Sequence, residues 1–271
     1  MRIPKNIRHY LNQIKLPSPD SHKGQNGKLL IIGGSELFHA ASKWSLDIAS
    51  KFVDMVFYSS VPLNNELIRE AKAKFWNGII VPRVNLDDYL DEADCILIGP
   101  GMERNKKTTS IVNNLLSKDP SKKWVIDAGA LQMIDTNLIN SHHIITPHHQ
   151  ELQLLMKNSK VDQIPVQDFL SVIHKPTILL KGPVDKIYAE DKVIKIAGGN
   201  AGMTKGGTGD VLAGLVAALY CTHEPVTAAV VASFINKKAG ESLYHRVGPY
   251  YNASDLVTEV PQIFWKILKS H

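Results

Sequence analysis

Residues 198–219 read GGNAGMTKGGTGDVLAGLVAAL, and this stretch decides the fold. Its first half is nearly bare of side chains, whereas its second half is a long apolar run of helix-forming residues. Gly206, Gly207 and Gly209 allow backbone conformations that a Cβ would resist. A glycine-rich turn that opens into a helix points N–H groups outward at the positive end of the helix dipole. The stretch therefore predicts a phosphate-binding turn.

Asp210 stands on the rim of this predicted anion site, where its carboxylate repels the phosphate that the N–H groups attract. The conflict is resolved if Asp210 accepts a proton as a general base. The structural alternative is a turn that only joins a strand to a helix, with Thr208 or Asp210 as a plain cap of the helix. The stretch lacks the G-x-x-x-x-G-K-[ST] string of a P-loop and lies late in the chain for a dinucleotide fingerprint. We therefore predict phosphoryl chemistry with Asp210 as the base.

The composition is that of an ordinary globular protein. The 271 residues, 44% of them apolar, suffice for one large α/β domain, and no run of about eighteen apolar residues indicates a membrane span. Cys95 and Cys221 show neither metal-ligand spacing nor a disulfide framework, so we expect a reduced, cytoplasmic protein. The net charge of +5 suits an anionic substrate, but the lysines are scattered, which argues against nucleic acid as a partner.

Apolar strands alternate with single helices over the first half of the chain. After an arm and loop at 1–27, strands are expected at 28–32, 54–59, 78–82, 94–98, 124–127 and 144–146, and helices at 40–52, 65–74, 86–93, 106–117 and 130–134. This alternation predicts a parallel sheet with helices on both faces. After helices at 151–156 and 166–174, three short strands at 177–181, 186–189 and 193–196 predict an antiparallel edge. Helices at 210–220, 226–245 and 253–267 follow, and we expect residues 1–271 to form a single domain.

Glycines and polar residues gather at the ends of these predicted strands. They are the segments 33–35 (GGS), 99–101 (GPG), Asp127, 146–148 (TPH) and the turn at 198–210. Ligands of open α/β sheets bind at the carboxyl ends of the strands. The sequence therefore predicts one active site along this edge of the sheet.

The same segments resemble the signatures of NAD(P)H-hydrate dehydratases, which belong to the ribokinase-like superfamily. NAGMTKGGTGD (200–210) is similar to the family pattern N-P-G-M-x-x-G-G-T-G-D. HKG (22–24) with IIGGS (31–35), GPG (99–101), DAGAL (127–131), TPHHQE (146–151) and LKG (180–182) match in the same order. The resemblance covers about residues 22–255 and implies a ribokinase-like three-layer α/β/α fold, its central sheet mostly parallel with a few antiparallel edge strands.

The chain departs from the family pattern at four places. Gly129 replaces the second aspartate of D-A-D-A-L, and Ala201 replaces a proline. Met102-Glu103 does not complete G-L-G, and His149-Gln150 follows the histidine of the TPH segment. These departures concern substrate contacts more than the phosphate-binding turn.

The resemblance implies a metabolite-repair reaction. ADP or ATP, with Mg²⁺, phosphorylates the hydroxyl of the S form of a hydrated nicotinamide nucleotide, NADHX or NADPHX, and phosphate then leaves to restore NADH or NADPH. Asp210 takes the hydroxyl proton. The family's fused epimerase domain is missing from this sequence, so a separate epimerase and a homo-oligomer (tetramer or dimer) are expected partners, with neither nucleic acid nor a membrane.

The resemblance also assigns residues to three groups. The expected nucleotide-binding residues are Lys181, Gly182, Pro183, Val184, Asp185, Gly206, Gly207, Thr208 and Gly209. The expected substrate-binding residues are Ala41, Gly101, His148, Asn200 and Asp210, with Asn200 bracing the anion-binding turn. Glu151 is a candidate for organising Mg²⁺ through water.

Two other functions remain open at this point. One is a small-alcohol kinase of the same superfamily, similar to hydroxyethylthiazole kinase. The other is a nucleotide-binding protein without catalysis, which the loss of an aspartate at Gly129 favours.

Overall fold

The computed structural model describes residues 3–161, 163–190 and 192–270. Its centre is a nine-stranded sheet in the order β3-β2-β1-β4-β5-β6-β7-β8-β9. The strands are β1 (Lys28–Ile32), β2 (Met55–Ser59), β3 (Ile79–Ile80), β4 (Cys95–Ile98), β5 (Lys123–Ile126), β6 (His143–Ile145), β7 (Thr177–Leu180), β8 (Val184–Ala189) and β9 (Lys192–Ala197). Pairing is parallel from β3 to β7 and antiparallel for β7–β8 and β8–β9. The predicted mostly parallel sheet with an antiparallel edge is confirmed.

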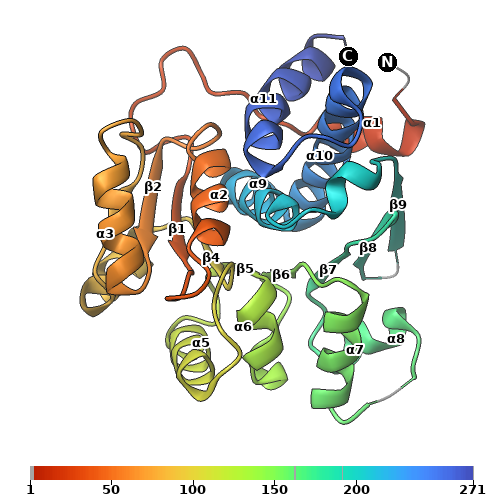
Figure 1. The fold of residues 1–271 in the computed structure, drawn as a ribbon. Coiled ribbons are helices and arrows are strands. Elements are labelled where there is room, and N and C mark those ends of the chain that lie inside the picture. Colours follow the sequence, from red (N-terminus) through yellow and green to blue (C-terminus); the bar gives the residue numbers. More distant parts are fainter. Residues whose placement is uncertain (1–2, 162, 191, 271) are drawn as a thin grey trace.

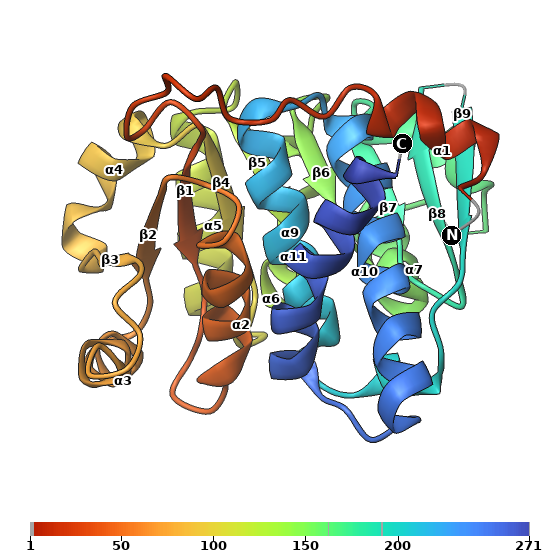
Figure 2. The ribbon, with the colours of Figure 1, turned by 90° about the horizontal axis from the view of Figure 1, so that it is seen from above.

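Helices cover both faces of this sheet (Figures 1 and 2). One layer contains α1 (Lys5–Leu11), α2 (Ala40–Ala49), α3 (Pro62–Ala71), α9 (Thr208–Thr222), α10 (Pro225–Val247) and α11 (Ala253–Lys269). The other contains α4 (Leu86–Glu92), α5 (Lys106–Lys118), α6 (Ala128–Met133), α7 (His149–Asn158) and α8 (Val166–Val172). Short 3₁₀ turns lie at Arg83–Asn85, Thr136–Leu138 and Ala201–Thr204. Each layer encloses a hydrophobic core against its face of the sheet: the first core lies under the α9 layer, and the second lies under the α5 layer. Because side chains alternate along a strand, Leu29 and Ile31 of β1 point into the first core, and Leu30 and Ile32 point into the second.

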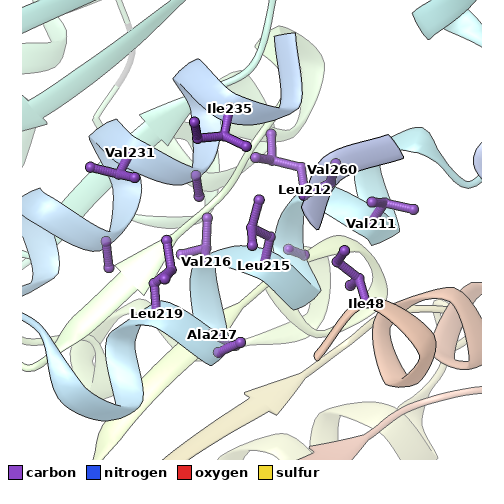
Figure 3. Close-up of a cluster of buried hydrophobic side chains, with 14 of the residues drawn as sticks. Ile48, Val211, Leu212, Leu215, Val216, Ala217, Leu219, Val231, Ile235 and Val260 are labelled. Carbon is purple, nitrogen blue, oxygen red and sulfur yellow. The ribbon is translucent and has the colours of Figure 1, made fainter. Parts of the chain in front are cut away.

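Helix α9, which follows the glycine-rich turn, is the most enclosed element of the molecule's first layer. It packs against α2, α10 and α11 and over β4 and β5. Figure 3 shows its Val211, Leu215 and Leu219 among side chains of the neighbouring helices, including Ile48 and Val231. A helix that is apolar all round belongs in a core. The burial of α9 therefore fixes the position of the turn at its N-terminus.

The N-terminal segment contains a helix that the sequence analysis does not predict. Residues 1–27 were expected to form an arm and loop, yet α1 occupies part of this range, and residues 1–2 lie outside the described residues. Ile7 and Leu11, one helical turn apart, are both buried against the first core. The helix is therefore held by tertiary packing rather than by local sequence preference.

The strand order reverses between β1 and β4, since β2 and β3 follow β1 on one side and β4 to β9 extend on the other. The loops after the parallel strands all emerge at the same edge of the sheet, where ligands of such folds bind. Among the described residues, no helix combines the length and apolar character that crossing a membrane requires.

Candidate active site

A cavity of about 620 Å³ lies where β6 and β7 end and α9 begins. This size is typical of small-molecule sites. It brings together residues that are up to 89 positions apart in the sequence, from His148 to Lys237. The residues of the sequence prediction that line it are His148, Lys181, Gly182, Pro183, Asp185, Asn200, Thr208 and Gly209.

The glycine-rich turn leaves several backbone N–H groups unpaired. Gly207 is the N-cap of α9 with φ 93°, and a Cβ there would lie 2.4 Å from the ring of Trp44, so only glycine fits. Within the described part of the chain, no protein acceptor pairs with the N–H of Gly206, Gly207 or Gly209. The turn can therefore donate to an anion at the N-terminus of a helix.

Neither Thr208 nor Asp210 caps α9, contrary to the structural alternative for this turn. The helix begins at Thr208, and Gly207 occupies the cap position without a side-chain cap. The Thr208 hydroxyl lies within hydrogen-bonding distance of the carbonyl oxygens of Met203 (2.7 Å) and Lys205 (2.9 Å), so it closes the turn as a donor. The helix N-terminus is consequently left without an oxygen acceptor of its own.

An ion pair links two strands beside this turn. Lys181, directly after β7, donates from Nζ to Oδ1 of Asp127, which follows β5, at 2.7 Å. Asp127 is 2% exposed and also accepts from the hydroxyl of Thr146 at 2.8 Å. Burial lowers the pKa of Lys181, but the carboxylates of Asp127, Glu151 and Asp210 outweigh it, so the pKa is raised. Lys181 is therefore a permanent cation facing the cavity.

Asp210 lies in the first turn of α9, directly after cavity-lining Gly209. Burial raises the pKa of Asp210 to about 7, the Asp127 carboxylate adds to the rise, and Lys181 opposes it. The backbone carbonyl of Asp210 accepts from the Ser45 hydroxyl of α2 at 2.9 Å. Asp210 is thus a half-buried carboxyl that can exchange a proton near neutral pH.

Ala41 and Gly101 lie on the α2 side of Asp210 rather than in the cavity lining. A Cβ on Gly101 would approach that of Ala41 to 3.1 Å, so the two positions are in contact. Ala41 is one helical turn before Ser45, which bonds to Asp210. The predicted substrate-binding residues Ala41 and Gly101 therefore contact each other outside the cavity lining, whereas His148 lines the cavity.

The turn 182–185 is held by a buried network that includes a residue missed in the sequence analysis. Asp185 accepts from the Gly182 N–H at 2.9 Å and from the Ser233 hydroxyl at 2.7 Å. Lys237 of α10 donates to the carbonyls of Gly182, Pro183 and Gly198 at 3.0–3.3 Å and lies 3.3 Å from Asp185 Oδ1. The ammonium group therefore ties together two loops that line the cavity.

Asn200 holds the segment that precedes the anion-binding turn. Its Oδ1 accepts from the Gly202 N–H at 2.9 Å and from the Tyr251 hydroxyl at 2.7 Å, and its Nδ2 donates to Gly240 O at 2.8 Å. Val184, by contrast, begins β8 with its side chain 40% exposed and is not among the cavity-lining residues.

His148 and Glu151 form a capping box at the start of α7. The Glu151 N–H donates to His148 Nδ1, and Glu151 Oε2 accepts from the His148 N–H at 2.9 Å. Oε1 accepts from Gln132 Nε2 at 3.0 Å. Glu151 thus has a structural role, and its carboxylate is also near enough to Lys181 to raise that pKa.

The carboxylates around Lys181 could bind Mg²⁺ only together with a phosphate ligand. In the described ranges, no group of three or more His, Cys, Asp or Glu side chains has the arrangement to hold a metal ion. Mg²⁺ usually keeps several waters and binds one or two carboxylates together with substrate phosphates. Asp127, Glu151 and Asp210, beside the free N–H groups of the turn, are compatible with that mode.

Comparison with known proteins places the chain in a family. The family model described as NAD(P)H-hydrate dehydratase matches residues 29–262. A bifunctional NAD(P)H-hydrate repair enzyme of Methanocaldococcus jannaschii is 35% identical over 93% of this chain and 51% of its own length. An ADP-dependent (S)-NAD(P)H-hydrate dehydratase of Nitrosopumilus maritimus is 31% identical over 90% of each chain. The chain spans about half the length of the first relatives it matches.

Solved structures agree on the fold. A ribokinase-like superfamily protein of Enterococcus faecalis has a TM-score of 0.85 at 22% identity, covering 97% of this chain and 95% of that one. An ADP/ATP-dependent NAD(P)H-hydrate dehydratase of Bacillus subtilis has a TM-score of 0.76 at 20% identity, covering 97% of each chain. The fold is therefore ribokinase-like, as the sequence predicts. With the family model matching most of its length, the chain belongs to the NAD(P)H-hydrate dehydratase family.

Proposed function

We propose that this chain uses ADP or ATP to dehydrate the S form of NADHX or NADPHX to NADH or NADPH. Two relatives are named ADP-dependent (S)-NAD(P)H-hydrate dehydratase, and this chain covers 90% of the length of each. The structural neighbour from Bacillus subtilis was co-crystallised with ATP and Mg²⁺. The observation that carries the proposal is Asp210, a carboxyl with a pKa of about 7 beside unpaired N–H groups at the start of α9.

The reaction needs a nucleotide because hydroxide is a poor leaving group. The hydroxyl oxygen of the hydrate attacks the terminal phosphoryl group, its O–H bond breaks, and Asp210 takes the proton. The new O–P bond forms as the nucleotide leaves one phosphate shorter. The C–O bond then breaks, phosphate departs, and a neighbouring ring carbon gives its proton to water as the C=C bond re-forms. General-base assistance contributes about 10²–10⁴-fold.

The chain's own groups position both reactants. The N–H groups of Gly206, Gly207 and Gly209 donate to the transferring phosphoryl group, and Lys181 balances its charge. The turn 182–185 holds the rest of the nucleotide, with Val184 at its exposed end. On the other side of Asp210, the hydrate lies against Ala41, Gly101 and His148, and Asn200 keeps the turn in shape. Glu151 would help to order Mg²⁺ through water, and the bound ion would neutralise phosphate charge.

The partners follow from this chemistry. An enzyme specific for the S form leaves the R form untouched, so we propose that an epimerase activity works alongside this chain. We also propose that residues 1–271 act as one dehydratase domain in a homo-oligomer, a dimer or tetramer, in the cytoplasm.

A turnover assay with the purified chain tests the proposal. NADHX or NADPHX is mixed with ADP or ATP and Mg²⁺, and the recovery of reduced nicotinamide absorbance is followed. We expect one AMP (from ADP) and one phosphate for each NADH formed. Phosphorylation of a thiazole alcohol without NADH recovery would assign the chain to the small-alcohol kinases instead. Binding of nucleotide with turnover of neither compound would indicate a non-catalytic nucleotide-binding protein.

A further inference from the structure

Asn236 of α10 is a buried amide without a partner on the wall of the active-site cavity. The residue is 3% exposed, and it lines the same cavity as Lys181 and Gly209. Its Oδ1 is shielded from solvent and accepts no hydrogen bond from any described residue. A buried carbonyl oxygen without a donor costs free energy, so such an atom calls for an explanation.

The neighbouring polar groups of α10 do not share this property. Ser233 donates to Asp185 at 2.7 Å, and Lys237 donates to three backbone carbonyls. Both side chains therefore have a structural role in holding the loops. Among the cavity-lining residues, all of which lie in the described ranges, Asn236 is the one with a buried side-chain atom left unsatisfied.

The surroundings of Asn236 suit a flat aromatic ring. Leu212, one helical turn beyond Gly209 on α9, and Met203 of the loop line the same cavity. Met203 packs over Gly240, one turn after Asn236 on α10, because a Cβ at Gly240 would lie 2.5 Å from its Sδ. An apolar wall with one polar group is how proteins orient a small-molecule ring. With phosphates at Gly207 and Gly209, this part of the cavity is left for the other end of the nucleotide.

We propose that Asn236 reads the adenine base of the nucleotide. When the side chain turns its shielded Oδ1 toward the cavity, Oδ1 accepts from the 6-amino group and Nδ2 donates to the adjacent ring nitrogen, which is the bidentate pairing that asparagine makes with adenine. Met203 and Leu212 contact the faces of the ring. This inference rests on the proposed function, since it assigns the base-binding end of the same nucleotide site.

The test compares ADP with purine riboside 5′-diphosphate, which lacks only the 6-amino group. Dissociation constants are measured by calorimetry for the full chain and for Asn236→Ala, and each nucleotide is also assayed as donor with NADHX. The wild type should prefer ADP by about tenfold, and Asn236→Ala should bind the two nucleotides equally. Thr204→Val, at another cavity-lining position, is the control and should keep the wild-type ratio.

The ratio of the dissociation constants for ADP and purine riboside 5′-diphosphate tests this inference separately from the proposed function. If the wild type binds ADP and turns over NADHX, but the preference for ADP is the same in Asn236→Ala, Asn236 does not read the base. Should Asn236→Ala fold poorly, Asn236→Leu keeps the volume of the side chain and is measured in the same way. If the wild type binds neither nucleotide, the proposed function itself fails.

Discussion

The Lys181 ammonium lies 2.7 Å from the Asp127 carboxylate, and both groups set the protonation of Asp210. Burial raises the pKa of Asp210, the Asp127 carboxylate adds to the rise, and Lys181 opposes it. The pairing joins residues that follow β5 and β7, with β6 between them in the sheet. The proton affinity of the proposed base therefore depends, besides its burial, on charges that follow two strands to which Asp210 does not belong.

Asp127→Asn should shift the pH dependence of turnover toward acid. Because the variant removes a negative charge that raises the pKa of Asp210, the base ionises at lower pH, and the acid limb of the kcat profile should move down by about one pH unit. Thr146→Val is the matched control, since it removes the hydrogen bond to Asp127 but keeps the charge. An acid limb that stays in place or moves to higher pH would contradict the assignment.

Asp210→Asn should strongly reduce turnover yet stabilise the protein above neutral pH. The folded chain holds the Asp210 proton more tightly than the unfolded chain does, because the pKa is about 7 rather than 3.8. Stability is therefore fully present below about pH 4 and is lost as the pH rises toward 7. That difference corresponds to at most about 4 kcal/mol, and we expect about 2 kcal/mol after solvent screening at a half-buried group.

Thermal unfolding at two pH values tests whether the ionised Asp210 carboxylate destabilises the folded chain. At pH 8 the Asn variant should melt roughly 5 °C above the wild type, and at pH 4 the two should coincide. Turnover should fall by about 10²–10⁴-fold while ADP still binds. Equal melting temperatures at both pH values would mean that the carboxyl is not desolvated in the folded chain.

Most of the fold is readable from the sequence because parallel strands buried on both faces leave long apolar segments. The strands 28–32 and 94–98 were predicted within a residue of β1 and β4. Helix α1 was missed, since its seven residues carry only two buried apolar side chains and no side-chain cap. The cap of α9 was assigned wrongly, because Gly207 takes a left-handed conformation that frees Thr208 to donate inward.

The site is less readable, because its pairings cross the sheet. Strand ends could be predicted to converge, but the contact between Asp127 and Lys181, 54 positions apart, depends on the order β5-β6-β7. Asn236 and Lys237 lie inside α10, directly after a mostly apolar stretch of that helix. An Asn-Lys pair following a run of apolar residues was a signal that this face of α10 does not pack solely against other apolar groups.

Lys237→Met should loosen the nucleotide site and destabilise the chain. The methionine keeps much of the side-chain volume but leaves the carbonyls of Gly182 and Gly198 and the carboxylate of Asp185 without their cation. Removing one partner of a buried ion pair costs about 3–5 kcal/mol. Urea unfolding should show this loss, and calorimetry should show weaker ADP binding. The adjacent Lys238→Met removes a part-buried pair with Glu241 and a contact over the Phe234 ring, but no bond to the two loops, and should cost less than Lys237→Met. Similar losses in both variants would contradict the bracing role of Lys237.

Gly129→Asp, which restores the residue of the family pattern, should damage this chain. A Cβ at Gly129 would lie 2.0 Å from the carbonyl oxygen of Met102, so the backbone of the segment after β4 must move to admit any side chain. Overpacking costs about 1–3 kcal/mol, and a carboxylate at this buried position adds a desolvation cost. Gly129→Ala separates the two causes, because it has the steric conflict alone and should lose about 1–3 kcal/mol in urea unfolding.

Gly206→Ala provides the control for that comparison, since no heavy atom lies within 4 Å of its would-be Cβ and its stability should change by less than about 1 kcal/mol. If Gly129→Asp were as stable as the wild type, the close packing of Met102 on α6 would not be a constraint. If instead only the aspartate variant were destabilised and the alanine variant were not, charge burial would be the whole cause. The steric prediction requires both Gly129 variants to fall below the Gly206 control, because any Cβ at Gly129 meets the backbone carbonyl oxygen of Met102 at 2.0 Å.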